Sequence, residues 1–166
     1  MDWKGTPEGR PENLQQELGK RDPFELPEEE AYLSVLRTAD RLADQFRLLF
    51  AEHGLTPAQY NALRIIGARG KGGIPSQSIA KDLVTRDPDI TRLVARLVKA
   101  GLVERVASSE DRRVVRVVIR PEGTRLLRRL KGPVTALHRE QLGHLGERRL
   151  RQLSALLFQA RHPEEP

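Results

Sequence analysis

The sequence contains no cysteine among its 166 residues. This absence excludes disulfide bonds, thiolate metal ligands and an oxidation sensor based on cysteine. Aromatic residues make up only 4% of the chain, so its core must be built mainly from aliphatic side chains. No uninterrupted apolar run approaches the length of a membrane helix, and the first ten residues hold no apolar signal-peptide core. We therefore expect a cytoplasmic protein with no membrane partner.

The residues that usually carry catalysis or metal binding do not form a recognisable pattern. The four histidines show no metal-ligand spacing: His53, His138, His144 and His162. The pair Gly70-Lys71 suggests a phosphate loop, but the glycine spacing is wrong and no serine or threonine follows the lysine. No acid–base pair or nucleophile arrangement stands out. We expect no enzyme, no metal and no cofactor.

The charge of the chain favours a polyanionic partner. Its 29 lysines and arginines exceed its 23 acidic residues, and the formal charge is +6. Arginine far outnumbers lysine, and its guanidinium group binds phosphates and guanine edges through two hydrogen bonds. A GC-rich genome would also enrich arginine, but over the whole surface. The central third concentrates arginine on faces expected to be exposed, which favours nucleic acid.

A short amphipathic helix is predicted between Thr85 and Gly101. Its apolar positions recur at helical spacing: Ile90, Leu93, Val94, Leu97 and Val98. The opposite face is polar and basic: Thr91, Arg92, Arg96 and Lys99. Asp87 can cap this helix, Pro88 suits its first position and Gly101 suits its end. A helix with one buried and one basic face, preceded by a tight turn, is what a reader of duplex DNA requires.

The flanking segments predict a helix before the turn and a hairpin after the reading helix. Ser76–Val84 forms the first helix, with four residues inward: Ile79, Ala80, Leu83 and Val84. Small Ala80 would allow the second helix to approach closely. Two strands follow, at 101–106 and 114–120, with Ile74 as a short strand beside them. On the return strand Val115, Val117 and Ile119 share one face. The polar tip carries arginines that can reach a narrow minor groove.

These segments resemble the MarR family of bacterial transcription regulators. The resemblance is carried by three runs: Asp87-Pro88-Asp89-Ile90-Thr91-Arg92-Leu93, Lys99-Ala100-Gly101-Leu102-Val103-Glu104-Arg105 and Glu110-Asp111-Arg112-Arg113. It covers the chain from about Glu25 to Arg161. It implies a mainly α fold with a small β-hairpin wing, a winged helix-turn-helix with N- and C-terminal dimerisation helices. It also implies that Arg113 enters the minor groove while Asp111 orients it.

Long helices are expected on both sides of this reading part. We expect a flexible arm over residues 1–26 and a single domain over 27–161, with dimerisation helices at 27–54 and 121–161 and the winged helix at 55–120. A capping box begins the helix at Thr56. A flexible link is expected at 67–73, and Gly132-Pro133 should kink or break the helix that starts at Pro121. The terminal helices carry more apolar surface than the DNA-reading part of one chain can cover. This excess indicates a homodimer.

For several candidate DNA-binding residues, a structural role is an alternative to a DNA contact. The set is Ser76, Gln77, Ser78, Arg86, Asp89, Thr91, Arg92, Arg96, Asp111, Arg112 and Arg113. Arg92 and Thr91 are expected to meet base edges. Asp89 either accepts from cytosine or offsets the helix dipole, and Arg96 and Lys99 either touch phosphates or are solvated. Ser76–Ser78 either bind a phosphate or cap their helix. Arg86 is a candidate for a phosphate or a base, and Arg112 meets either phosphate or solvent.

The sequence therefore predicts a sequence-specific regulator, most simply a repressor that binds a near-palindromic operator in double-stranded DNA. The resemblance implies a small phenolic or anionic effector in a cleft near four residues and the start of the Pro121 helix: Tyr32, Leu36, Tyr60 and Leu63. That cleft would equally fit plain core. The main alternative is a sequence-indifferent chromosome-organising protein, since the same charge would serve it. An enzyme with an unrecognised site is a weaker alternative.

Overall fold

The computed structural model describes residues 11–84, 89–107 and 115–163. The chain forms two compact units, Met1–Asp44 and Gln45–Pro166, and their boundary falls within helix α2 (Pro27–Ala51). Among the helices of these described ranges, none combines the length and the apolar content needed to cross a bilayer.

The first unit contains helix α1 (Leu14–Glu17) and the N-terminal part of α2. Asn13 caps α1, because its side-chain oxygen accepts from the backbone N–H of Gln16 at 3.0 Å. An ion pair of 2.9 Å joins Glu17 of α1 to the Nε of Arg37 on α2. Residues 11–26 of the expected arm thus include an ordered turn of helix, and residues 1–10 lie outside the described residues.

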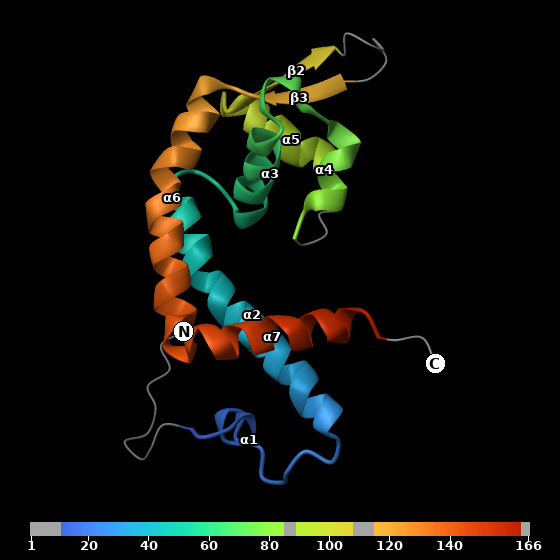
Figure 1. The fold of residues 1–166 in the computed structure, drawn as a ribbon, viewed down its shortest axis with the longest axis vertical. Coiled ribbons are helices and arrows are strands. Elements are labelled where there is room, and N and C mark those ends of the chain that lie inside the picture. Colours follow the sequence, from blue (N-terminus) through green and yellow to red (C-terminus); the bar gives the residue numbers. More distant parts are fainter. Residues whose placement is uncertain (1–10, 85–88, 108–114, 164–166) are drawn as a thin grey trace. The chain divides into compact units, whose positions relative to one another are not determined.

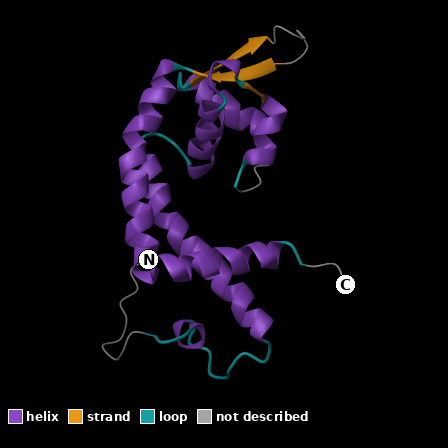
Figure 2. Ribbon diagram, in the orientation of Figure 1, coloured by secondary structure: helices purple, strands orange, loops and turns teal. Residues whose placement is uncertain are grey.

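The second unit holds the remaining elements, drawn in Figures 1 and 2. In chain order they are α3 (Pro57–Ala68), η1 (Gly70–Gly72), β1 (Ile74–Pro75), α4 (Ser76–Asp82), α5 (Ile90–Lys99), β2 (Val103–Ala107), β3 (Val115–Ile119), α6 (Pro121–Leu142), η2 (Gly143–Leu145) and α7 (Gly146–Arg161). The three strands form an antiparallel sheet in the order β1-β3-β2. Helices with a small β-hairpin are the architecture that the sequence predicts.

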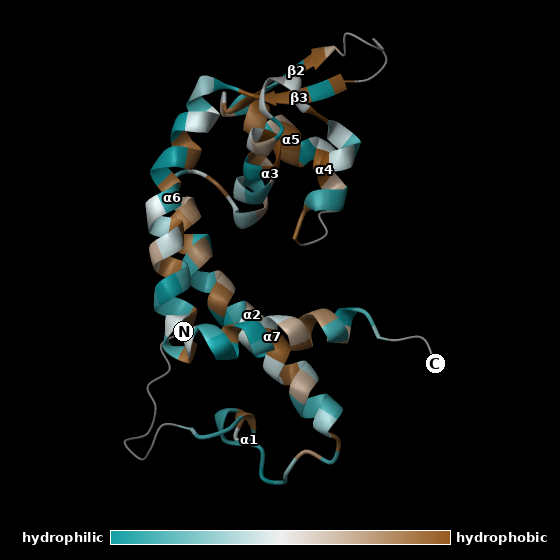
Figure 3. Ribbon diagram, in the orientation of Figure 1, coloured by the Kyte–Doolittle hydropathy of each residue, from teal (hydrophilic) through white to brown (hydrophobic). Residues whose placement is uncertain are grey.

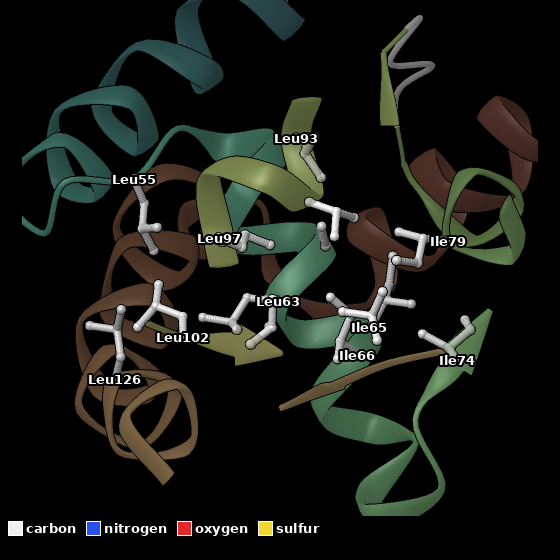
Figure 4. Packing of buried hydrophobic residues seen from close by; sticks show 14 of the residues in the cluster. Leu55, Leu63, Ile65, Ile66, Ile74, Ile79, Leu93, Leu97, Leu102 and Leu126 are labelled. Carbon is white, nitrogen blue, oxygen red and sulfur yellow. The ribbon is translucent and has the colours of Figure 1, made fainter. Parts of the chain in front are cut away.

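The core of the second unit is aliphatic, as the scarcity of aromatic residues requires. Its largest fully buried side chains come from four helices and two strands, α3, α4, α5, α6, β2 and β3: Leu63, Ile66, Ile79, Val94, Leu97, Val103, Val117 and Leu130. Figure 4 shows this packing, in which α3 supplies the central residues. Each such side chain contributes roughly 1.5–3 kcal/mol through burial. The core thereby fixes α4, α5 and the sheet around α3.

Helix α3 begins as predicted. The hydroxyl of Thr56 accepts from the backbone N–H of Gln59 at 3.2 Å, and the Gln59 side chain accepts from the N–H of Thr56 at 2.8 Å. Pro57 occupies the first turn, where its missing N–H costs no hydrogen bond. The end of α3 differs from the prediction. It extends to Ala68 and η1 follows, so 67–73 is largely helical rather than a flexible link.

The first helix of the reading motif is shorter than predicted. It ends at Asp82, and only Ile79 is fully buried in it, with Leu83 half-buried just beyond its end. Ala80 is exposed and Val84 is 81% exposed, so the prediction that both point inward was wrong. Ile79 already defines the inward face, and Ala80 lies about 100° around the helix from it. Ala80 therefore does not govern how closely α5 approaches.

Helix α6 runs without interruption from Pro121 to Leu142, with Pro133 inside it. Of the kink or break predicted at Gly132-Pro133, the break does not occur. Proline removes one donor and crowds the preceding turn, but the helix is anchored on both sides of it. Leu126 and Leu130 are buried before the proline, and after it the ring of His138 contacts the ring of Phe46 in a tilted arrangement, with centroids 4.8 Å apart. These contacts stabilise α6 on both sides of Pro133 and keep the helix continuous.

Candidate nucleic-acid interface

The recognition helix α5 has one buried and one open face. Leu93, Val94 and Leu97 are buried in the core that also holds Ile79 of α4. The side chains of Thr91, Arg92, Arg96 and Lys99 are exposed on the other side. The apolar half of the predicted pattern thus fixes the helix on the core, and its polar half is left at the surface. Figure 1 shows α5 between α3 and the strands.

The cap of α5 is Asp89 rather than Asp87. One carboxylate oxygen of Asp89 accepts from the backbone N–H of Arg92 at 2.9 Å, and the other lies 3.0 Å from the Nε of Arg92. Helix α5 begins at Ile90, so Pro88 does not occupy its first position. Asp87 and Pro88 themselves lie outside the described residues. Both oxygens of Asp89 are therefore engaged within its own helix.

This pair also determines which atoms of Arg92 are available. The side chain of Arg92 is 82% exposed although its Nε faces Asp89. The contact uses the inner nitrogen and leaves the two terminal nitrogens for another partner. Those terminal nitrogens are the ones that a guanidinium group presents to the O6 and N7 atoms of guanine. The carboxylate thus restrains a side chain that is otherwise free in solvent.

Two arginines of the hairpin bind backbone carbonyls, one in the link before β1 and the other in α5. The guanidinium of Arg116 on β3 donates to the carbonyl oxygens of Gly72 and Gly73, at 2.6 and 3.0 Å. Arg105 on β2 donates to the carbonyl of Thr91 in the first turn of α5, at 3.4 Å. Neither contact is predicted by the sequence. Strand alternation predicts that Arg116 and Val117 lie on opposite faces of the sheet. Nothing in the sequence indicates that Arg116 binds a backbone carbonyl.

The other predicted site residues fall into two groups. Ser76, Gln77 and Ser78 form the first turn of α4, where Gln77 is exposed and both serines are half-buried. The residue before them, Pro75, provides no side-chain cap. Arg86 and the segment Asp111–Arg113 lie outside the described residues. The hairpin that leads to this segment is present, with Val103 paired to Ile119 and Ala107 paired to Val115.

The effector cleft expected from the sequence is partly core. Leu63 is fully buried, and the ring of Tyr60 stacks on Phe50 with centroids 4.3 Å apart. A hollow of about 380 Å³ in this unit includes the start of the Pro121 helix, as expected, but is not lined by Tyr60 or Leu63. It is lined by the α2–α3 turn, the end of α5 and the first turns of α6: His53, Gly54, Leu55, Ala100, Leu102, Glu122, Arg125, Leu126 and Arg129.

The lining of this hollow combines an apolar floor with a charged rim. Leu55, Leu102 and Leu126 are buried, whereas Arg125 and Arg129 are exposed one turn apart on α6. Arg125 pairs with Glu122 at 2.9 Å. The carboxylate of Glu122 accepts a hydrogen bond from its own backbone N–H, which lowers its pKa, and the charges of Arg125 and Arg120 lower this pKa further. Nowhere in the described ranges do three or more metal-ligating side chains gather.

The chain was compared with known families and structures. A family model described as MarR family matches residues 53–114. A crystal structure of a MarR transcription factor from Planctomyces limnophilus is 39% identical, with a TM-score of 0.64, over 81% of this chain and 98% of that one. The chain belongs to the MarR family. Members of this family are DNA-binding transcription regulators with a winged helix, which confirms the resemblance found in the sequence.

Two further MarR-type relatives show how far the likeness extends. The regulator FarR of Neisseria gonorrhoeae is 29% identical over 94 residues, which are 57% of this chain and 63% of that protein. The match thus spans less than two thirds of FarR. Bordetella bronchiseptica BpsR, whose DNA binding is regulated by 6-hydroxynicotinic acid, is 20% identical with a TM-score of 0.73 over 86% of this chain and all of BpsR. At that identity BpsR supports the MarR fold alone.

Proposed function

We propose that this MarR-family protein is a repressor that binds a near-palindromic operator as a homodimer and responds to a small ligand. The observation that carries the proposal is the open face of α5. Its apolar residues hold it on the core, and Arg92 is exposed beside a carboxylate that restrains it. A helix held in this way can enter a major groove with its N-terminal residues toward the bases.

The candidate residues then divide by the part of the duplex that they meet. Thr91 and Arg92 contact base edges, with Asp89 orienting Arg92. Arg96, Lys99 and Arg86 contact phosphates, together with the turn at Ser76–Ser78. In the wing, Arg113 enters the minor groove, Asp111 orients it and Arg112 meets phosphate or solvent. The basic character of these residues matches the charge of the duplex.

A second copy of the chain is proposed because α7 lacks a buried face. No residue of α7 is buried, yet apolar residues recur along it in Figure 3. Leu156 and Phe158 are 63% and 58% exposed. In the first unit, Tyr32, Val35 and Leu36 of α2 are likewise exposed. Apolar surface of this kind is usually covered in a two-fold dimer, and a two-fold dimer binds a near-palindrome.

The hollow beside α6 is the proposed effector site. Its leucine floor suits an apolar ring, and Arg129 on its rim suits a carboxylate or phenolate. Its walls include Ala100, the residue that follows α5, and Leu102, which leads into β2. A ligand seated there would contact the exit of the recognition helix directly. Such contact offers a route by which binding changes DNA affinity, as 6-hydroxynicotinic acid does for BpsR.

Selection of bound duplexes from a random library tests the central proposal. The selected near-palindrome should bind at least roughly a thousandfold tighter than random duplex at physiological salt. Both affinities should fall as salt rises, because phosphate contacts release counterions. Equal affinity for selected and random duplex would instead identify a sequence-indifferent chromosome-organising protein.

A further inference from the structure

An arginine on each face of the wing hairpin binds a backbone carbonyl of a neighbouring segment. Arg105 pairs with Val117 across the sheet, and Arg116 pairs with Val106. Opposed residues share a face and successive residues alternate, so Arg105 and Arg116 lie on opposite faces. Arg105 donates to the carbonyl of Thr91, and Arg116 donates to the link before β1. These contacts hold the hairpin against α5 on one side and against the approach to α4 on the other.

The link that receives Arg116 is shaped for this contact. Gly73 has a φ of 60°, a conformation that favours glycine. A Cβ at this position would lie 2.6 Å from the carbonyl oxygen of Val117 and 2.7 Å from a methyl of Val118. The next residue, Ile74, is buried and pairs with Val117. The backbone therefore touches β3 closely at the point where Arg116 binds it.

The chemistry of this contact suits arginine and does not suit lysine. A guanidinium group presents several N–H donors in one plane, and Arg116 uses Nε and a terminal nitrogen on two successive carbonyls. Hydrogen bonds that involve a charged donor are stronger than neutral ones. Lysine keeps the charge but presents a single nitrogen, so it cannot reproduce the planar fork. Arginine-to-lysine substitution thus separates the geometry of the contact from its charge.

We infer that Arg116 is a positioning residue for DNA recognition. It fixes the base of the wing relative to α4 and α5. The wing and the recognition helix can then contact the duplex at the same time. This inference rests on the proposed DNA-binding function. It also assigns one of the arginines near the reading surface to the protein's own backbone. Its contribution to DNA affinity comes through the position of the hairpin and not through contact with a phosphate.

The test compares two arginine-to-lysine variants of the full-length chain. Arg116→Lys removes the fork, and Arg128→Lys makes the same change at an exposed arginine of α6 that takes no part in the hairpin contacts. Amide hydrogen exchange of β2 and β3 is measured without DNA, and affinity is measured for the duplex selected by the parent protein. Gly73→Ala provides a second way to disturb the contact, because its Cβ would collide with β3.

Arg116→Lys should speed hairpin exchange by about tenfold or more, since hydrogen bonds with a charged donor are lost. Its affinity for the selected duplex should fall by about the same factor, since a displaced wing loses its contacts. Gly73→Ala should act in the same direction, whereas Arg128→Lys should leave both readouts unchanged. Unchanged exchange in Arg116→Lys would overturn the inference, as would faster exchange with undiminished affinity. A parent protein without preference for any duplex would refute the proposed function, while the exchange result would still decide whether Arg116 holds the hairpin.

Discussion

At the scale of single residues, Asp89 has two tasks that can be separated. One oxygen caps α5 through the backbone N–H of Arg92, and the other faces the guanidinium of the same residue. The ion pair is largely exposed, so it contributes little to stability. Under the proposed function, its role is to restrain a long side chain that reaches a base edge. Serine can replace the first task but not the second.

The first prediction uses that difference. Asp89→Ala should lower the free energy of unfolding by about 1 kcal/mol, because α5 loses its cap. Asp89→Ser should restore most of this stability, because serine is also a good N-cap. Both variants should bind the selected duplex more weakly than the parent, since Arg92 is no longer restrained. Denaturant titration and DNA titration measure the two effects. Tighter DNA binding by both variants would mean that Asp89 acts only as a repelling charge.

The second prediction concerns Arg92 itself. Arg92→Ala should cost roughly 1–3 kcal/mol of DNA-binding free energy and relax the preference at one base pair in each half-site. Arg113→Ala should also weaken binding but blunt only a preference for narrow A·T-rich flanks. Affinities for duplexes altered at each position distinguish these results. If Arg92→Ala weakens all sequences equally, Arg92 contacts phosphate.

At the scale of elements, the start of α6 is packed tightly against the sheet. A Cβ on Gly123 would lie 2.9 Å from Ile119 and would also collide with the carbonyl of Leu102. Gly143, at the end of the same helix, has open space around it and a φ of −61°. The same substitution should therefore have opposite effects at the two ends.

The third prediction follows from this contrast. Gly123→Ala should lower the free energy of unfolding by roughly 1–3 kcal/mol, because a methyl group is forced into filled space. Gly143→Ala should raise it by roughly 0.4–1 kcal/mol, because alanine restricts only the unfolded chain. Chemical denaturation at one fixed protein concentration provides both values. Equal effects at the two sites would show that the approach of α6 to the sheet is not close.

The elements also show what the sequence could and could not predict. Apolar spacing predicted α5 and its buried face, because a period of 3.6 is a property of local sequence. Its cap was misplaced by two residues, since Asp87 and Asp89 are equally good caps until the fold fixes where the helix starts. Pro133 does not break α6, because tertiary contacts on either side of the proline outweigh its local cost. The partners of Arg116 lie more than forty positions away along the chain, beyond any local pattern.

At the scale of the whole molecule, assembly is tested on α7. Truncation after Leu142 removes an apolar stripe made of Leu150, Leu153, Leu156 and Leu157, and should abolish both dimerisation and operator binding. Leu156→Glu should weaken the dimer without disturbing the core, because the side chain is 63% exposed. Ala155→Glu places the same charge at an exposed position that lies about 100° or more around the helix from each of these leucines, and it serves as the control. Sedimentation gives the mass of each variant. A truncated chain that remains a folded monomer and still binds a full operator tightly would overturn the proposed interface.

The absence of buried residues in α7 has a consequence for how the protein would behave in a growing cell. If a second copy supplies the cover, thermal stability follows the law of mass action and rises with the number of copies per cell volume. Each division dilutes the copies, so a population that outpaces synthesis would hold more unpaired chains with an uncovered helix. Regulator abundance and resistance to proteolysis would then fall together. The threshold at which the target genes escape repression would therefore be sharper than operator affinity alone implies.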